Sequence, residues 1–461
     1  MTSNRSIFKD ILDSKYANKI LFFIMAAIIL ALITDTLLIR TDVFISKRHY
    51  GWNVSVFIVI SFIYVTGQYI ILEFIKHKTN IVGSKGTLQL RSVHKMVRVS
   101  QYTLTIIIVI TILQILGSSY YDSGLLVAGI PISYTVAIIL LGILARQFLL
   151  WLKSKRDLLV LLYGSACISL AISLTFTLAY VELIAYGLPK NIYPHAGVVL
   201  PFVVGGSLKD FLGSASIVSS VVSFIITWIA TTIHLRHFSL RFGKIGYWII
   251  FSIPMVYFLS QFITITLNLL NPFIRADLIS SAITFNVIFT LSKPLGGILF
   301  GIAFWAIAKN ISRNAAVKDY LILSAYGLTL IFVSDQATVL VTAPYPPFGL
   351  ATTSFLGLSS YLMLTGIYSA AISVSHDIEL RQSIRKLTLR ETRLLNSIGT
   401  AHMQQEVKNR VETIIQAHKD TITEQSGIHS SFDEENIQAY IDEVLKEINN
   451  QRKTKRSNRT S

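Results

Sequence analysis

Long apolar runs alternate with short polar connections over most of the chain. The ten runs cover approximately residues 19–39, 54–75, 102–119, 124–152, 157–186, 213–235, 245–270, 283–309, 318–342 and 349–375. An α-helix needs about 20 mainly apolar residues to cross the hydrocarbon core of a bilayer, and each run is close to or above this length. The pattern therefore predicts an all-α fold, a polytopic transmembrane bundle of about ten spans within residues 1–375.

After residue 375 the pattern becomes amphipathic. Apolar residues from Leu380 to Ile422 recur at steps of three, four or seven, which predicts a cytosolic helix over residues 376–427 that continues the last span without a break. The same spacing favours coiled-coil pairing. The capping-box sequence that begins at Ser431 predicts a short second helix over residues 428–452, and the basic residues 453–461 are typical of a disordered end.

Composition agrees with a membrane protein. The chain is 52% hydrophobic and 14% charged, whereas soluble domains are about a quarter charged. Residues 1–375 hold 27 Lys and Arg against 12 Asp and Glu, and the remaining residues hold 14 against 13. The excess of basic residues lies in short connections beside apolar runs, where they orient helices and contact anionic lipid. This placement argues against a nucleic-acid partner and favours the lipid bilayer.

The distribution of basic residues also predicts orientation. Lys and Arg concentrate in the second, fourth, sixth and eighth connections, which places these on the cytoplasmic side and both termini with them. The first connection departs from this pattern, because Arg40, Lys47 and Arg48 would then lie outside. If the first run were a cleaved signal segment, nine spans would remain; its length favours a retained span. The predicted location is the cell membrane.

Ionisable residues inside apolar runs are the main functional candidates, because a charge in the bilayer is costly unless it is paired or hydrated. Lys293 and Asp335 lie on consecutive spans and are expected to pair, while Asp35 and Glu182 lie near the outer ends of their spans. We predict an outward-facing polar cavity among the fifth, seventh, eighth and ninth spans. Its candidate residues are Lys293, Asp335, Glu182, Asn286, Thr290, Gln261 and Gln336.

Each candidate also has a purely structural interpretation. The Lys293 and Asp335 pair would join two helices, and Glu182 and Asp35 would reach water at the headgroups. The spacing of Gly297 and Gly301 is typical of close helix packing. The His234-x-x-His237 pair lacks a third ligand nearby and is interpreted as a solvated pair at the membrane surface.

No catalytic or cofactor motif occurs. The chain lacks G-x-x-x-x-G-K-[ST], H-E-x-x-H and G-x-S-x-G, and its single cysteine, Cys167, allows no intrachain disulfide and no thiolate metal site. We therefore expect neither an enzyme nor a bound cofactor or metal. The preferred hypothesis is a receptor or signalling scaffold that couples a small ligand in the cavity to the cytosolic helix; the alternative is a secondary transporter or channel for a small charged solute or a proton.

The receptor hypothesis assigns partners to the tail. Residues 377–450 would bind a cytosolic protein or self-associate. The segments that begin at Ala343, Gly357, Gly366 and Leu380 resemble those of multi-spanning membrane proteins of ammonia-oxidising archaea, most clearly over residues 335–415. The resemblance implies an archaeal cell membrane and supplies no activity or site residues.

Overall fold

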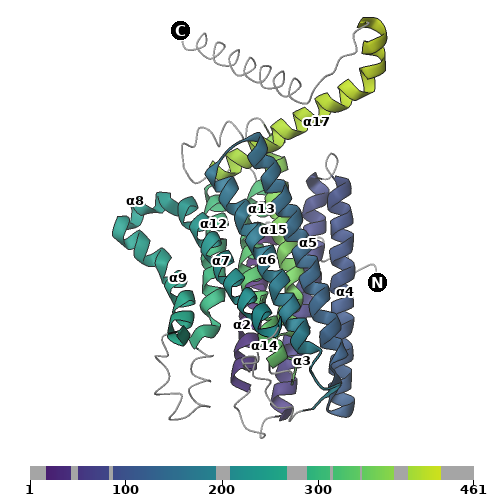
Figure 1. Ribbon diagram of the computed structural model, residues 1–461, viewed down its shortest axis with the longest axis vertical. Coiled ribbons are helices and arrows are strands. Elements are labelled where there is room, and N and C mark those ends of the chain that lie inside the picture. Colours follow the sequence, from purple (N-terminus) through teal and green to yellow (C-terminus); the bar gives the residue numbers. More distant parts are fainter. Residues whose placement is uncertain are drawn as a thin grey trace.

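The computed structural model describes residues 17–42, 50–82, 87–193, 208–266, 288–311, 315–342, 345–377 and 393–426. It confirms the all-α polytopic bundle. Within these residues, 10 helices are long and apolar enough to cross a membrane, and they stand side by side in one bundle (Figure 1). The protein is an integral membrane protein by this criterion.

The bundle is built from long helices with a few short elements between them. The long helices are α2 (Ala17–Asp42), α3 (Tyr50–Val82), α4 (Thr87–Ser118), α5 (Gly124–Ser154), α6 (Leu158–Ala185), α7 (Leu208–Leu235), α9 (Lys244–Thr266), α12 (Ser292–Asn310), α13 (Ala315–Ser334) and α15 (Leu350–His376). The short elements are η2 (Arg236–Phe238), α8 (Ser239–Phe242) and α14 (Ala337–Thr342), and α17 (Arg393–Ser426) follows the bundle. Strands β1 (Tyr121–Asp122) and β2 (Asn191–Ile192) form a two-residue antiparallel pair.

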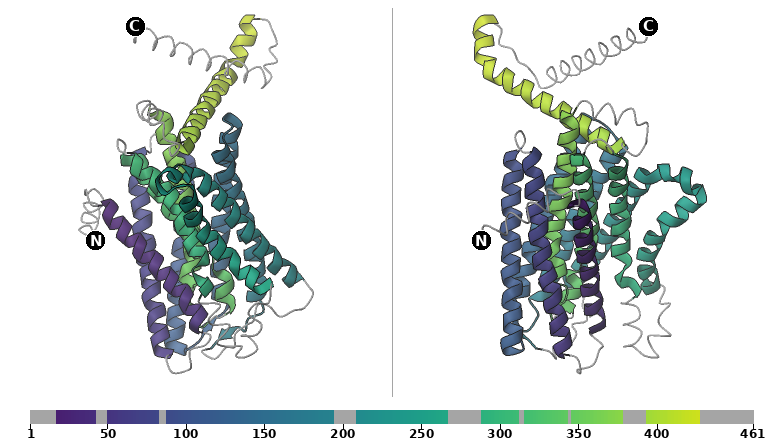
Figure 2. Two further views of the ribbon diagram at one scale, coloured as in Figure 1. Left: turned by 90° about the vertical axis from the view of Figure 1, so that its left-hand side faces the viewer. Right: turned by 180° about the vertical axis from the view of Figure 1, so that it is seen from behind.

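The two ends of the bundle differ. We call the end that carries α17 and the α5–α6 connection the tail end, and the end that carries β1 and β2 the opposite end (Figure 1). Helix α17 crosses the tail end at an angle to the spans in all three views (Figures 1 and 2). Odd and even spans alternate in direction, so the helix ends that are rich in Lys and Arg lie at the tail end.

Helix α15 forms the centre of the bundle. It packs against α13, α5, α3 and α4, and nearly all of its side chains are buried although many are hydroxyls. These hydroxyls donate to backbone carbonyls one turn earlier, as Ser354 does to Leu350 and Ser359 does to Phe355, both at 2.7 Å. Because the hydrogen bond is satisfied within the helix, a small polar side chain can be buried and still let a neighbouring helix approach closely.

Glycines mark the closest helix contacts. A Cβ atom on Gly327 of α13 would lie 2.8 Å from the Ser359 carbonyl oxygen of α15. On α12, a Cβ on Gly297 or Gly301 would lie 2.9 Å or 2.7 Å from carbonyl oxygens of α13. The packing role predicted for Gly297 and Gly301 is therefore confirmed.

We expect Gly327→Ala to lower the free energy of unfolding by about 1–3 kcal/mol, because the added methyl group must push α13 away from α15. Gly142 on α5 is the matched control, since nothing lies within 4 Å of the position that a Cβ there would occupy. Gly142→Ala should be neutral or slightly stabilising. Thermal unfolding of both variants in detergent measures the difference, and equal stability of the two variants would contradict it.

The ninth span departs from the sequence prediction. The apolar pattern predicts a continuous helix over residues 318–342, but α13 ends at Ser334 and α14 begins at Ala337, with Asp335 and Gln336 outside any helix. We call these two residues the α13–α14 break. Tyr134 of α5 contacts both sides of it: its hydroxyl donates to Asp335 Oδ1 at 2.8 Å and accepts from the Ala337 N–H at 3.4 Å. A side chain from another helix therefore supplies hydrogen bonds where the helical ladder is interrupted.

The tail also departs from the prediction. Helix α15 ends at His376, and Asp377 has an extended backbone with φ −93° and ψ 104°. The expected uninterrupted helix from the last span into the tail is therefore wrong. Instead, α17 packs against α15 and α5, because its first turns bury Leu394, Leu395 and Ile398 against the bundle. The predicted elements over residues 428–452 and 453–461 lie outside the described residues, and coiled-coil pairing stays a prediction.

One carboxylate connects α17 to the bundle. Asp157 caps α6, because its Oδ1 accepts from the Leu159 N–H at 2.9 Å. Its Oδ2 accepts from Arg393 Nε and from Ser397 Oγ of α17, each at 3.0 Å. The side chain of Asp157 is only 7% exposed, so the contact is partly shielded from solvent. The start of α17 is thus held at the α5–α6 connection.

Candidate functional site

A polar cavity of about 160 Å³ lies inside the bundle, among α6, α7, α9, the start of α12 and the α13–α14 break. It is lined by Thr177, Ser216, Ile217, Ser220, Phe258, Gln261, Phe262, Phe289, Thr290, Ser292, Lys293, Asp335, Gln336 and Thr338. Five of the residues predicted from the sequence meet here: Gln261, Thr290, Lys293, Asp335 and Gln336. Lys293 lies in the first turn of α12, so the cavity is nearer the opposite end than the tail end.

An ion pair lines this cavity. Lys293 Nζ lies 2.8 Å from Asp335 Oδ2, and the two side chains are 24% and 12% exposed. The other carboxylate oxygen, Oδ1, accepts a hydrogen bond from the Tyr134 hydroxyl at 2.8 Å. Both oxygens of Asp335 are therefore engaged by strong, charge-assisted hydrogen bonds. The ion pair expected from the sequence is present.

The pair lies where the chain is not helical. Asp335 is held at the α13–α14 break, between the last turn of α13 and the first turn of α14. Non-helical backbone at membrane depth is tolerated where it is buried in protein or lines a cavity. Discontinuous helices with charged groups at the break are also a recurrent way of building ion and substrate sites in transporters. The break and the ion pair together distinguish this cavity from ordinary helix packing.

Two of the residues predicted to line the cavity, Glu182 and Asn286, are not among the described residues that line it. Glu182 is on α6 but does not line the cavity, and its Oε1 is buried elsewhere in the bundle. The reason is helical geometry: Glu182 is five residues after Thr177, which does line the cavity, so the two side chains are about 140° apart around the helix. The predicted grouping of Glu182 with Lys293 and Asp335 is therefore wrong. Asn286 lies outside the described residues.

Two helices of the site were not predicted from the sequence. Ser216 and Ser220 come from α7, a span that the predicted cavity does not include. The signal was available, because Ser216, Ser220, Ser223 and Thr227 follow helical spacing on an otherwise apolar span. Tyr134 of α5 had no comparable signal, because a tyrosine in an apolar run is ordinary and only its position beside Asp335 gives it a role.

Asp35 has a structural role away from the cavity. Its side chain is fully buried in α2, and Oδ2 accepts from the N–H groups of Gly349 at 2.8 Å and Thr352 at 3.3 Å. The Thr352 hydroxyl also donates to it at 2.5 Å. Asp35 therefore caps the N-terminus of α15 from a neighbouring helix. The expectation that it reaches water at the headgroups is wrong.

The solvated histidine pair expected from the sequence is wrong for His234, which lies in the last turn of α7; His237 lies in the next element, η2. His234 is buried, and its Nδ1 lies 3.0 Å from the Tyr163 hydroxyl of α6. The aromatic rings of Tyr163 and Phe304 surround it. Among the described residues, no group of three or more His, Cys, Asp and Glu side chains is placed to hold a metal ion. His234 is thus part of the packing between α6, α7 and α12.

The polar cavity combines two opposite charges with uncharged hydrogen-bonding groups. Lys293 offers an ammonium, Asp335 a carboxylate, and Gln261, Gln336 and Thr290 offer amide and hydroxyl groups. A small anion can replace Asp335 as the partner of Lys293, and a small cation or a proton can replace Lys293 at Asp335. The volume admits several water molecules or a solute of similar size.

Comparison with protein families, with curated proteins and with solved structures finds no match to this chain. Fold by itself does not determine function. The basis for a functional proposal is the geometry of the polar cavity and its surroundings in the bundle.

Proposed function

We propose that the protein is a secondary transporter of the cell membrane, in which a small charged solute or a proton binds in the polar cavity between Lys293 and Asp335. The observation that carries this proposal is the ion pair at the α13–α14 break, where both charges line a cavity. An ionisable pair inside a membrane is costly to retain. A pair that only joined two helices would not need a cavity or an interrupted helix beside it.

The geometry supports a mechanism of partner exchange. Lys293 and Asp335 neutralise each other at a distance of 2.8 Å. A bound solute takes the place of one partner, and Tyr134 keeps its hydrogen bond to Asp335 while the pair is open. Because α13 and α14 meet at Asp335, a change in its partner acts directly on a joint between two helices. Movement at this joint would expose the cavity to the two sides of the membrane in turn.

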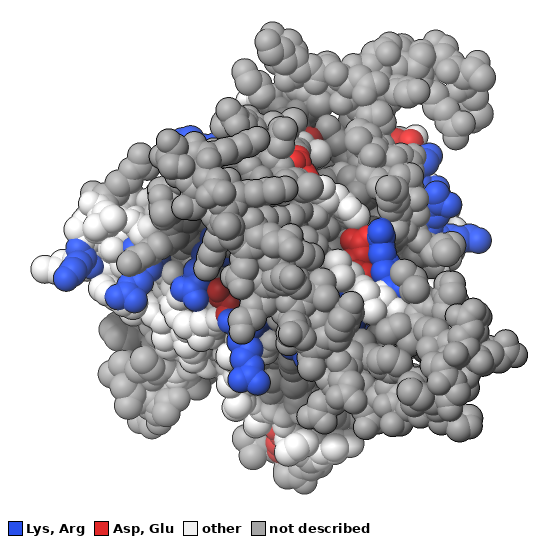
Figure 3. Space-filling model, turned by 90° about the horizontal axis from the view of Figure 1, so that it is seen from above, with Lys and Arg blue, Asp and Glu red and all other residues white. Residues whose placement is uncertain are grey.

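The distribution of charge supports an orientation with the tail end in the cytoplasm. Seen from the tail end, more Lys and Arg than Asp and Glu are visible among the described side chains (Figure 3). The last turn of α5 and the α5–α6 connection together carry Lys153, Lys155 and Arg156. Positively charged connections remain on the cytoplasmic side during insertion. In this orientation both termini are cytoplasmic and the polar cavity lies in the outer half of the membrane.

Thiol labelling tests transport without knowledge of the solute. Cys167 is the single cysteine and is buried, so Cys167→Ala provides a background without thiols. In that background we expect Gln261→Cys and Ser220→Cys, which line the cavity, to react with a membrane-impermeant thiol reagent. A transporter exposes its site alternately, so labelling should occur from the outside in right-side-out vesicles and from the cytoplasmic side in inverted vesicles.

A matched control comes from the same helix as Ser220. Thr227 on α7 is buried and does not line the cavity, so Thr227→Cys should remain unlabelled from both sides. Protection of the cavity positions from both sides would contradict the proposal. Labelling from one side only would contradict alternating access and favour the second candidate.

The second candidate is a receptor or signalling scaffold. The continuous helix from α15 into the tail, which would favour a receptor, is absent. Another observation supports the receptor: α13, which ends at the break, packs along α15, and α15 contacts α17 at the tail end. A ligand that shifted Asp335 would act on α13, and α13 lies against the helix that supports α17. This path requires that the helices have two discrete arrangements. One-sided labelling of the cavity distinguishes this candidate from a transporter.

A further inference from the structure

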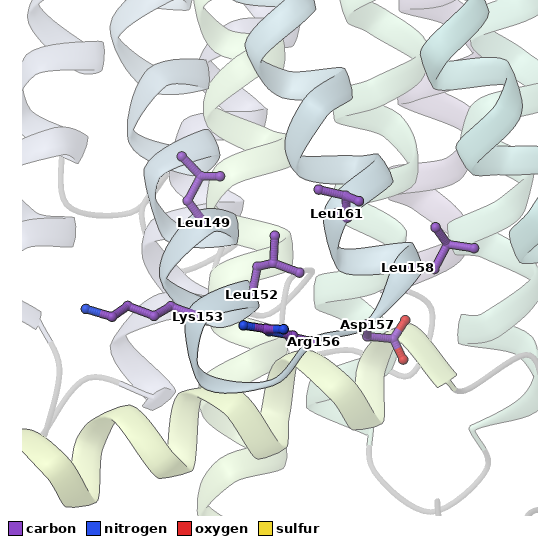
Figure 4. Close-up of a pocket in the computed structure, with 7 residues that line it drawn as sticks. All are labelled: Leu149, Leu152, Lys153, Arg156, Asp157, Leu158 and Leu161. Atoms are coloured by element: carbon purple, nitrogen blue, oxygen red, sulfur yellow. The ribbon is translucent and has the colours of Figure 1, made fainter. Parts of the chain in front are cut away.

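An open depression of about 610 Å³ lies at the tail end, between the last turns of α5 and the first turns of α6. Its lining combines two cations, Lys153 and Arg156, with four leucines. In Figure 4, Lys153 and Arg156 lie near the α5–α6 connection and α17, and Leu149 and Leu161 lie farther from α17 along the two helices. The leucines are Leu149, Leu152, Leu158 and Leu161. The depression is separate from the polar cavity.

Three of the four leucines face outward from the bundle. Leu149, Leu158 and Leu161 are 49%, 50% and 45% exposed. All three belong to helices that cross the membrane, so their exposed surface lies against lipid. The depression thus provides an apolar track that runs along the hydrocarbon and ends at two cations beside the membrane surface. A cationic end beside an apolar face suits one lipid molecule, with its headgroup at the cations and the first part of an acyl chain along the helices.

Asp157 also lines the depression, and a free carboxylate there would offset the cations. Its oxygens are engaged elsewhere: Oδ1 accepts from the Leu159 N–H, and Oδ2 accepts from Arg393 and Ser397. Arg393 therefore offsets the charge of Asp157, which leaves the charges of Lys153 and Arg156 to the depression. Both side chains are exposed. Docking of α17 in this way keeps the depression positively charged.

We propose that this depression binds an anionic phospholipid, with its phosphate against Lys153 and Arg156 and an acyl chain along Leu149, Leu158 and Leu161. A zwitterionic lipid carries its own cation, which these two side chains repel. A soluble phosphate lacks the acyl chain that the leucines accommodate. The proposal does not depend on transport.

Native mass spectrometry of the full chain in detergent tests this proposal. The protein is titrated with phosphatidylglycerol and, separately, with phosphatidylcholine. Lys153→Gln combined with Arg156→Gln should weaken phosphatidylglycerol binding by about tenfold or more, because two charge-assisted contacts are lost. Phosphatidylcholine binding should not change. Arg91→Gln with Lys95→Gln removes the same charge from exposed positions of α4 outside the depression and should leave both lipids unaffected.

A second variant tests the apolar part with the cations intact. Leu161→Trp fills the track and should also weaken phosphatidylglycerol binding, and it serves as an independent test if the double variant does not fold. Inorganic phosphate should not displace the lipid. Three results would overturn the proposal: an unchanged affinity in the Lys153 and Arg156 variant, an equal loss in the α4 control, or displacement of phosphatidylglycerol by inorganic phosphate.

Discussion

Lys293→Met alone should lower the free energy of unfolding by about 3–5 kcal/mol, because it leaves the largely buried Asp335 carboxylate without its partner. Asp335→Asn alone should have a similar effect, because it leaves the Lys293 ammonium uncompensated. The ion pair is short, at 2.8 Å, and Asp335 is only 12% exposed. Water therefore cannot replace the missing partner fully.

The double variant with both substitutions should be much more stable than the sum of the single variants predicts. Neither charge remains to be solvated, and Asn at position 335 keeps an oxygen for the Tyr134 hydroxyl. A double-mutant cycle from thermal unfolding in detergent measures the coupling between the two positions. Transport that depends on the pair should be absent from the folded double variant, which separates the loss of function from the loss of stability.

An exposed ion pair of α17 is the matched control for this cycle. Arg410 and Glu406 are 2.7 Å apart, and their side chains are 68% and 31% exposed. Their coupling should be about 1 kcal/mol or less, because water screens both charges. If the Lys293 and Asp335 losses were simply additive, the two groups would not act as a pair, and both the stability argument and the proposed partner exchange would be contradicted.

Asp35→Ala should lower the free energy of unfolding by about 3 kcal/mol. The substitution leaves the N–H groups of Gly349 and Thr352, together with the Thr352 hydroxyl, without the carboxylate oxygen that accepts from them. These donors are buried at the start of α15, where water cannot replace the acceptor. Because α15 is the central helix of the bundle, the loss affects its packing against several neighbours at once.

Asp35→Asn should cost about 1 kcal/mol or less, because it keeps an oxygen acceptor and removes the cost of burying a charge. Thr34→Ala is the control on the same helix, since Thr34 is exposed and its hydroxyl donates to the Leu30 carbonyl of its own helix. It should not change the stability. Equal losses of stability for Asp35→Ala and Asp35→Asn would contradict this account. They would show that the charge of Asp35, and not its role as a hydrogen-bond acceptor, stabilises the start of α15.

The spans, their approximate limits and the expected ion pair could be predicted from the sequence. Whether a segment enters a bilayer depends mainly on the length and polarity of that segment itself, so about 20 consecutive residues contain most of the information. The pairing of Lys293 with Asp335 follows from the same rule, because two opposite charges on consecutive spans both require a partner. Gln261, Thr290 and Gln336 are recognisable as polar positions on these spans for the same reason.

Other features depended on contacts between residues far apart in the chain, and only the tertiary structure decided them. Glu182 lies outside the cavity and Ser216 within it because of how α6 and α7 are rotated against their neighbours. The break at Asp335 is supported by Tyr134, which is 201 residues away in the chain. Helix α17 crosses the tail end because its first turns bury Leu394, Leu395 and Ile398 against the bundle. Polarity along one segment determines that it crosses the membrane, whereas the side chains that meet inside the bundle are determined by the packing of all the spans together.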